Sequence, residues 1–522
     1  MTERLSAREV VALLADDFAE IPYPERRSKP DGPLAWQGYD ASRARAAERT
    51  GEQESVICGT ACVEGTRAVL IAFEFGFLGG SLGERTGDRL EAAYRYAREH
   101  RLPVVPLVAT GGSRMQEGML ALSQLQRVAR ESALTRAAGL PQIAVLRDPT
   151  TGGGWATLGA GADVILALPG AQVGFAGSRV RPPDADPAAY TAEAQVAAGA
   201  ADAVVRPREL RETLGRWLRL LARPSGGPGD GAADGRTAER APAPGRSASG
   251  GTGRASTDAA GAGGAADGRA ADVAVTPERP APGGTGSGAP DASWAALPAP
   301  PFEPAPVPDP LGTTGLPATG WDAVRRARSP ERPRAEAYLD AYFTHRAALS
   351  GDRCGGTDPG MLCGFGEHEG RTIAYAAQTG TATRPAGYRT ATRLIRLADR
   401  LGIPVLTLVD TPGAANDAEA ERQGAGAAIA DLFTTVASAR TPITTLLIGE
   451  GGSGGALALA APGRTYATPD SYFSVIAPEL AAAILKRAPE EVEATADQLR
   501  IRPQDLVDLG VVAPPTGSSF TP

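Results

Sequence analysis

The sequence predicts an α/β fold that is present in two copies along the chain. Three observations support this prediction. Short apolar runs end in glycine and lead into helical patterns, the same pattern returns later in the chain, and a segment rich in glycine, alanine and proline separates the two occurrences. We therefore expect a first domain at 1–222, a linker at 223–310 and a second domain at 311–522.

Strands and helices are expected to alternate in the first domain. The expected strands are 55–62, 68–75, 103–108, 141–146 and a strand–turn–strand unit within 162–177. The expected helices are 10–18, 209–221 and a segment with Leu90, Ala93, Tyr94 and Ala97 at i, i+3, i+4 and i+7. The run at 103–108 is too short for a typical helix, which favours a buried strand.

The second domain shows the same alternation. The expected helices are 320–328, 334–349 and one beginning at Pro385, with Leu394, Leu397, Ala398 and Leu401 on one face. The expected strands are 371–377, 403–409 and 442–448. Between the domains, residues 223–310 contain few large apolar side chains and cannot bury a core, so we expect a disordered, flexible linker.

Prolines mark the repeat. Pro103 and Pro404 each begin a buried strand, Pro141 and Pro442 begin the next one, and both pairs are 301 positions apart. The same spacing aligns Gly153-Gly154 with Gly454-Gly455. A constant spacing across two elements means that no net insertion separates them, so two copies of one fold are the simplest explanation.

The glycine-rich strand ends are the candidate sites. Glycine lets another molecule approach backbone N–H groups closely, and such a strand–helix junction can bind phosphate or hold an oxyanion. Gly449-x-Gly451-x-x-Gly454 matches a dinucleotide fingerprint, but little chain follows it. Gly451-x-Ser453-x-Gly455 matches a hydrolase nucleophile elbow, but no histidine follows it. The absence of a Gly-Lys-Ser/Thr sequence excludes a P-loop.

Composition narrows the chemistry. The net charge of −7 argues against a general nucleic-acid surface, and no run approaches the ~18 apolar residues of a membrane span. Four cysteines without zinc-ribbon spacing, and no signal-peptide core, favour a cytoplasmic protein without a metal. The acidic residues at strand ends are explained by helix capping or by solvated loops and need no catalytic role. The backbone amides of the glycine loops are therefore the main candidate groups for binding or catalysis. They suit a transition state with charge on a carbonyl oxygen and a base supplied by substrate or cofactor.

Several motifs in the same order resemble the acetyl-CoA carboxylase carboxyltransferase family. The first domain resembles its β subunit through residues 73–83, 111–117, 148–153 and 174–177. The second resembles its α subunit through residues 321–328, 330–333, 385–389, 410–414, 448–458 and 472–478. The resemblance covers most of both domains, with β preceding α.

The resemblance implies one crotonase-like (ClpP-like) ββα superhelix per domain. It implies an acetyl-CoA carboxytransferase that moves CO2 from carboxybiotin to acetyl-CoA, giving malonyl-CoA for fatty-acid or polyketide synthesis. In the family's mechanism, biotin releases CO2, its ureido nitrogen removes the acyl α-proton, and the enolate attacks CO2. The thioester enolate and the ureido oxygen are then the two anions that need stabilising.

The resemblance also implies site residues. Gly111 and Gly112 are expected to line the acyl oxyanion hole, while the Gly455 and Ala456 amides are expected to serve biotin. The expected substrate-binding residues are Gly79, Gly80, Arg114, Gly153, Gly154, Gly177, Gly413 and Gly454. Arg114, Arg179 and Arg181 are candidates for contacts with the CoA phosphates.

Two departures from the family pattern affect the expected partners. The four-cysteine zinc ribbon of the bacterial β subunit is missing, and the two subunits form one chain. No Met-Lys-Met biotinylation site occurs, so biotin is expected on a separate biotin carboxyl carrier protein that a biotin carboxylase serves. Family architecture joins halves of different protomers, which implies a homodimer or larger homo-oligomer.

Other reactions remain open from the sequence. Propionyl-CoA differs from acetyl-CoA by one methylene, worth ~1–3 kcal/mol in a pocket. A crotonase-fold hydratase, isomerase or biotin-dependent decarboxylase is an alternative, although a hydratase needs a protein acid or base that does not stand out. A scaffold without catalysis is a third alternative, which the glycine loops in both halves disfavour.

Overall fold

The computed structural model describes residues 4–24, 26, 29–222 and 302–514. Most of the predicted linker, 223–301, lies outside the described residues. The remaining part of that prediction, 302–310, lies inside, where Ala305 is buried and its carbonyl accepts a hydrogen bond from Thr444 Oγ1 at 2.8 Å. This segment therefore packs against the second domain.

Each domain contains one sheet. The first sheet has the order β1-β2-β3-β4-β5-β6-β8, with β7 paired to β5. Its strands are β1 (Phe18–Glu20), β2 (Val56–Val63), β3 (Thr66–Phe73), β4 (Val104–Thr110), β5 (Ile143–Thr151), β6 (Val164–Ala167), β7 (Val173–Gly174) and β8 (Ala203–Val204). The second sheet has the order β14-β13-β12-β11-β10-β9, with β15 paired to β13. Its strands are β9 (His345–Ala348), β10 (Met361–His368), β11 (Arg371–Gln378), β12 (Val405–Thr411), β13 (Ile443–Gly452), β14 (Thr465–Ala467) and β15 (Tyr472–Ser474).

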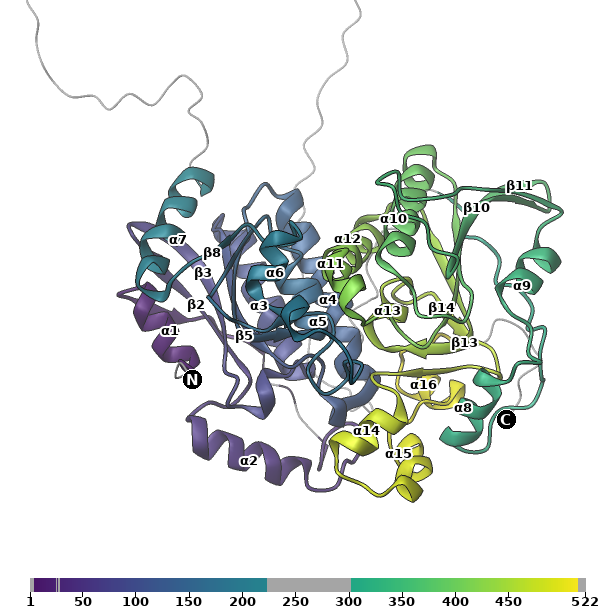
Figure 1. The fold of residues 1–522 in the computed structure, drawn as a ribbon, viewed down its shortest axis with the longest axis horizontal. Coiled ribbons are helices and arrows are strands. Elements are labelled where there is room, and N and C mark those ends of the chain that lie inside the picture. The colour runs from purple at the N-terminus through teal and green to yellow at the C-terminus, as the bar shows by residue number, and fades with distance from the viewer. Residues whose placement is uncertain (1–3, 25, 27–28, 223–301, 515–522) are drawn as a thin grey trace, which may run out of the picture. The chain divides into compact units, whose positions relative to one another are not determined.

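Helices cover both sheets (Figure 1). Those of the first lobe are α1 (Ala7–Leu14), α2 (Tyr39–Thr50), α3 (Glu84–His100), α4 (Gly118–Ala137), α5 (Gly152–Gly154), α6 (Ala192–Ala197) and α7 (Pro207–Ala222). Those of the second lobe are α8 (Gly320–Arg328), α9 (Ala335–Tyr342), α10 (Pro385–Leu401), α11 (Ala418–Arg422), α12 (Ala425–Ser438), α13 (Ser453–Leu457), α14 (Pro478–Ile484), α15 (Val492–Gln498) and α16 (Pro503–Asp508). The predicted pair of crotonase-like α/β lobes is confirmed.

The repeat predicted from the proline spacing is present in the strand register. Thr110 pairs with Thr150 at the ends of β4 and β5, and Thr411 pairs with Gly451 at the ends of β12 and β13. Both members of each pair are shifted by the same 301 positions. The register also slips at the same place in both lobes, just before Thr110 and just before Thr411. The two lobes thus open their strand ends in the same way.

Some sequence-based expectations for single elements were wrong. The helix expected at 334–349 ends at Tyr342, and the following residues form β9. Leu401, expected on one face of α10 with Leu394, Leu397 and Ala398, lies at the helix end and is 57% exposed. Helix α12 was missed because alanine and glycine dominate its first half, which weakens the periodic signal that large apolar residues give.

The two lobes meet through α4 and α12, which lie side by side (Figure 1). Leu122 and Leu125 of α4 belong to the same buried apolar cluster as Ile429 and Phe433 of α12. Gln126 of α4 donates a hydrogen bond to the carbonyl of Ala460 at 2.8 Å. Since α4 and α12 follow equivalent strands, the contact joins equivalent faces of the two lobes. Within the described ranges, no helix combines the length and the hydropathy needed to cross a bilayer.

Candidate functional site

The first lobe places its predicted glycines around the ends of β4 and β5. A methyl group on Gly80 would lie 2.1 Å from the carbonyl oxygen of Ala109, so the 79–80 turn packs directly on the end of β4. A methyl group on Gly152 would lie 3.2 Å from Gly112 Cα. The two loops therefore touch through backbone atoms, and larger residues do not fit between them.

The backbone donors of this lobe divide into two groups. The Gly111 amide donates to Gly79 O at 2.9 Å, and the Gly112 amide donates to Thr110 Oγ1 at 3.0 Å. Among the described residues, the amides of Gly153 and Gly154 have no acceptor. The Gly111 and Gly112 amides are thus occupied within the loop, and the expected place of these glycines in the lining of the acyl oxyanion hole stays a prediction. These glycines shape the loop, and the free donors belong to Gly153 and Gly154.

The second lobe repeats this geometry. The Gly413 amide donates to Thr411 Oγ1 at 3.1 Å, which is the counterpart of the Gly112–Thr110 bond. A methyl group on Gly455 would lie 2.4 Å from the nitrogen of Ala414. In the described part of this lobe, the amides of Gly454 and Gly455, in the first turn of α13, have no acceptor.

Both lobes turn from strand to helix through a left-handed residue. It is Gly152 with φ 63° in the first lobe and Ser453 with φ 55° in the second. A side chain in this conformation costs roughly 1–2 kcal/mol, so Ser453 holds the turn at some expense. The histidines lie elsewhere: His100 stacks on Tyr96 in α3, His368 stacks on Tyr342, and His345 pairs with Glu367.

The free amides of the two lobes lie against one helix, α4. A methyl group on Gly153 would lie 2.4 Å from Leu125 Cδ2, and one on Gly454 would lie 3.6 Å from Leu125 Cδ1. The Phe175 ring also faces Gly454, at 3.5 Å from the same methyl position. A methyl group on Gly177 would lie 3.4 Å from Thr151 Oγ1. One chain therefore brings both glycine loops to the same lobe interface.

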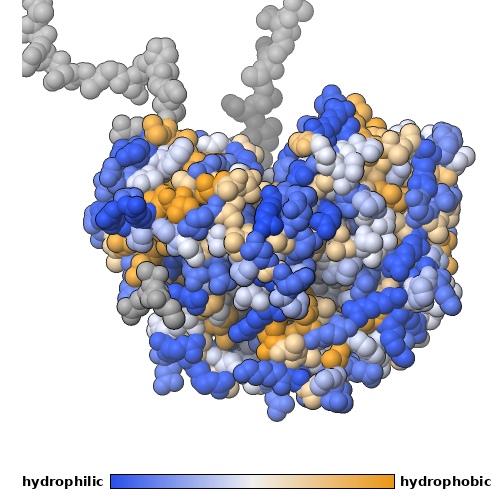
Figure 2. Space-filling model, viewed as in Figure 1, coloured by the Kyte–Doolittle hydropathy of each residue, from blue (hydrophilic) through white to orange (hydrophobic). Residues whose placement is uncertain are grey.

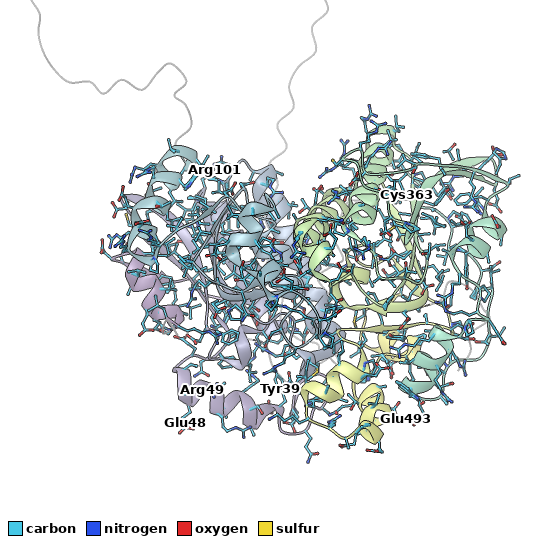
Figure 3. All side chains as sticks on the ribbon, in the orientation of Figure 1. Tyr39, Glu48, Arg49, Arg101, Cys363 and Glu493 are labelled. Atoms are coloured by element: carbon cyan, nitrogen blue, oxygen red, sulfur yellow. The ribbon has the colours of Figure 1, made fainter. Side chains whose placement is uncertain are left out.

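Arg114 lies in a buried ion-pair cluster. Its side chain is 1% exposed and pairs with Glu54 and Glu117, and it also donates to the carbonyl of Ser81 at 2.7 Å. Burial opposes both charges, but the ion pair keeps the pKa of Arg114 above its ordinary value and that of Glu54 below it. Tyr39, labelled in Figure 3, closes the cluster through a hydrogen bond to Glu117. Arg114 therefore anchors the 111–117 loop, and its expected substrate contact stays a prediction.

A buried ion pair that the sequence did not reveal holds the second lobe's loops. Asp410, at the end of β12, accepts from Arg332 Nη2 at 2.6 Å and from the Glu450 amide at 3.1 Å. Neither side chain is more than 3% exposed. Burial raises the pKa of Asp410, against the lowering effect of Arg332. The pair ties the 410–413 segment to the end of β13.

A second buried carboxylate joins the lobes. Glu421 of α11 accepts from the amides of Phe175 at 2.7 Å and Ala176 at 3.1 Å through Oε1. Its side chain is 1% exposed, and Oε2 has no partner in the described part of the chain. Burial raises the pKa of Glu421 to about 7. Glu421 therefore positions the Phe175 ring that faces Gly454.

Tyr388 supports the same loop from inside the second lobe. Its hydroxyl donates to the Gly455 carbonyl at 3.1 Å, and the side chain is fully buried. Arg181, a candidate CoA contact, stacks 3.9 Å from the Tyr190 ring centroid and donates to the Ala176 carbonyl. The repeated Thr110 and Thr411, which precede the glycines in both copies, are a sequence signal for residues that support the glycine loops.

Two family models match the two lobes of the chain. Residues 35–203 match the family model of the carboxyl transferase domain. Residues 317–514 match the model described as acetyl co-enzyme A carboxylase carboxyltransferase-like.

Relatives match nearly the full chain. The acetyl-coenzyme A carboxylase carboxyl transferase subunits beta/alpha of Salinispora arenicola are 35% identical, over 98% of this chain and 81% of that protein. The subunits of the same name from Saccharopolyspora erythraea are 34% identical, over 91% of this chain and 73% of that protein. The probable biotin-dependent acyl-coenzyme A carboxylase beta3 subunit of Mycobacterium tuberculosis is 31% identical, over 91% and 82%. The solved transcarboxylase 12S is 18% identical, with a TM-score of 0.36 over 98% of this chain and 86% of that one.

Two crotonase-like lobes with free amides at their strand ends, together with the two matched family models, define a biotin-dependent carboxyltransferase. The chain belongs to the acetyl-CoA carboxylase carboxyl transferase family, with its β-type lobe preceding its α-type lobe.

Replacing Asp410 by asparagine is expected to lower the free energy of unfolding by about 3–5 kcal/mol, because Arg332 stays buried without a counter-charge. Urea denaturation measures this loss. The exposed Arg216–Glu212 pair of α7 provides the control, since Arg216→Gln is expected to change stability by less than about 1 kcal/mol. An Asp410→Asn protein as stable as the control would contradict the role of the ion pair.

The Glu421 carboxyl predicts a pH effect. Its folded pKa of about 7 lies above the ordinary value of 4.5, so between these values the folded state holds a proton that the unfolded state has released. This carboxyl therefore contributes a loss of stability as pH rises from about 4.5 to 7.

Glu421→Gln is expected to remove that contribution, so the variant gains stability relative to wild type as pH rises through this range. Urea midpoints at several pH values measure the difference. Glu212→Gln, at a 71% exposed side chain of α7, is the matched control and is expected to follow the wild-type profile. A Glu421→Gln profile parallel to that of wild type would contradict the assignment.

Proposed function

We propose that this protein transfers CO2 from carboxybiotin to acetyl-CoA to form malonyl-CoA. The observation that carries the proposal is the pair of side-chain-free amide loops, one per lobe, that both lie against Leu125. The names of the relatives support acetyl-CoA as the acyl substrate. Propionyl-CoA is the second candidate, because one relative is named an acyl-coenzyme A carboxylase subunit.

The first lobe would hold the acyl thioester. The Gly153 and Gly154 amides would donate to its oxygen as negative charge develops there, with Gly111, Gly112, Gly79 and Gly80 shaping the loop beside them. Donors that are fixed before the reaction stabilise such charge without reorganisation, and removing one from an oxyanion hole costs about 10²–10³ in rate.

The second lobe would hold biotin. The residues present fit this group, since Gly413 and Gly454 leave the loop without side chains and the Gly455 amide, in the first turn of α13, has no acceptor in the described residues. Carboxybiotin, when bound, would supply CO2 and a ureido nitrogen able to accept the acyl proton. Gly455 and Ala456 would donate to the ureido oxygen, and Tyr388 would hold the Gly455 carbonyl in place.

The partners follow from this assignment. Carboxybiotin would arrive on a separate biotin carboxyl carrier protein, loaded by a biotin carboxylase. We also propose a homodimer or larger homo-oligomer; because both glycine loops lie against Leu125 of the same chain, each protomer would carry its own site rather than share it as the family architecture implies. Equilibrium sedimentation tests this, and a fully active monomer would overturn it.

The activity is tested with purified protein, a carboxylated carrier protein and labelled acyl-CoAs. Malonyl-CoA is expected from acetyl-CoA, with slower turnover of propionyl-CoA. A rate on propionyl-CoA above that on acetyl-CoA would assign the longer substrate instead. Hydration of an enoyl-CoA without carboxyl transfer would overturn the proposed reaction.

The second-lobe glycine loop predicts a large loss of turnover when a side chain is added to it. Gly455→Ala places a methyl group 2.4 Å from the Ala414 nitrogen and displaces the second-lobe amides, so kcat is expected to fall about 100-fold or more. Gly315→Ala is the control, because a methyl group there meets nothing within 4 Å. Turnover at saturating acetyl-CoA and varied carrier protein measures the loss. Equal rates for the two variants would contradict the role of the second-lobe loop.

A further inference from the structure

A pocket lined mainly by arginine lies on α10, away from the glycine loops. It has a volume of about 360 Å³ and is lined by Arg353, Arg393, Arg396, Leu397 and Arg400. Four of these residues recur at i, i+3, i+4 and i+7 and so form one stripe along the helix. In Figure 2, strongly hydrophilic residues lie beside hydrophobic ones at the end of the second lobe that carries α10.

The loop before β10 holds Arg353 over this stripe. The Asp352 carboxylate accepts from the Cys354 and Gly356 amides at 2.7 and 2.8 Å, and from Arg389 at 2.8 Å. Arg353 itself has a left-handed φ of 63°. Arg393 ties the loop to the helix by donating to the Gly351 carbonyl at 2.8 Å. These bonds fix the loop that carries Arg353. They also engage the Asp352 carboxylate with the Cys354 and Gly356 amides and with Arg389.

The pocket has more positive charge than its carboxylates balance. Arg396 pairs with Asp431, while Arg353, Arg393 and Arg400 form no salt bridge with any described residue. The chain as a whole is acidic, with a net charge of −7, so this concentration of arginine is local. Arg400 in the last turn also favours the helix dipole, but that effect fades within one turn and does not explain Arg393 or Arg353.

Unpaired guanidinium groups around one concavity match the geometry of phosphate, which arginine binds through two parallel N–H donors. We propose that this pocket binds a multiply charged phosphate group. Arg396 lies eleven residues beyond Pro385, about 16 Å along the helix axis, so the pocket is separate from the second-lobe glycine loop near the start of α10.

Two sources can supply this chemistry: the phosphates of CoA, at the far end of an acyl substrate, or a free polyphosphate. The first source rests on the proposed function, and the second does not. Inorganic pyrophosphate is the probe for the shared chemistry, titrated calorimetrically into the full chain at low ionic strength. CoA and CoA without its 3′-phosphate are titrated in parallel.

Saturable pyrophosphate binding is expected, weakened about tenfold or more in the double variant Arg353→Gln/Arg400→Gln, because neither side chain has a hydrogen-bond or salt-bridge partner among the described residues. Arg216→Gln removes one exposed charge elsewhere and is expected to bind as wild type. Weaker binding of CoA by the double variant, with a smaller loss for CoA lacking the 3′-phosphate, would assign the CoA source. Pyrophosphate binding that saturating CoA leaves unchanged would assign a free polyphosphate.

Absence of saturable pyrophosphate binding, or equal binding by wild type and the double variant, would overturn the site. Urea denaturation checks that the double variant is folded, and Arg400→Gln alone is the milder replacement should it unfold. Carboxyl transfer measured without added phosphate separates this result from the proposed function: an active enzyme without pyrophosphate binding disproves the pocket only.

Discussion

The structure depends on the close approach of backbone segments at the ends of four parallel strands. A methyl group on Gly452 would lie 1.9 Å from the Pro412 carbonyl oxygen, and one on Gly154 would lie 2.2 Å from the Thr110 side chain. Side chains are therefore excluded where the loops meet. What remains at the surface of these loops is main chain, and its N–H groups at the helix starts have no internal acceptor among the described residues. The chemistry of the site follows from this packing.

The supports of the loops differ between the lobes although the loops repeat. In the first lobe, Arg114 is buried among Glu54, Glu117 and Tyr39, whereas the second lobe uses the Arg332–Asp410 pair. The shared device is the threonine hydroxyl that accepts from the following glycine amide, Thr110 in one lobe and Thr411 in the other. The loop geometry is thus the repeated feature, and each lobe stabilises it with its own charges.

Local patterns in the sequence predicted the central strands β2 to β5 and β11 to β13, the repeat and the glycine loops, because each depends on neighbouring residues. Apolar runs show buried strands, and the constant proline spacing shows two copies. The acceptors of the Gly111 and Gly112 amides, Gly79 O and Thr110 Oγ1, could not be predicted, because they depend on how the loop folds back. The role of Glu421 could not be predicted either, since its partner Phe175 lies 246 positions away in the chain. The strand β9 was missed because its exposed residues show no apolar alternation.

Leu125 contacts a glycine loop from each lobe of the same chain, so the central claim is that one chain assembles one complete site. The most direct test combines two inactive chains, one with Gly154→Val and one with Gly455→Val, carrying different tags and purified together after co-expression. Carboxyl transfer by the mixture is predicted to stay as low as that of either variant alone, because each chain has one damaged loop. Recovered activity in the mixture would show that the loops of different chains form the site, and would contradict the claim.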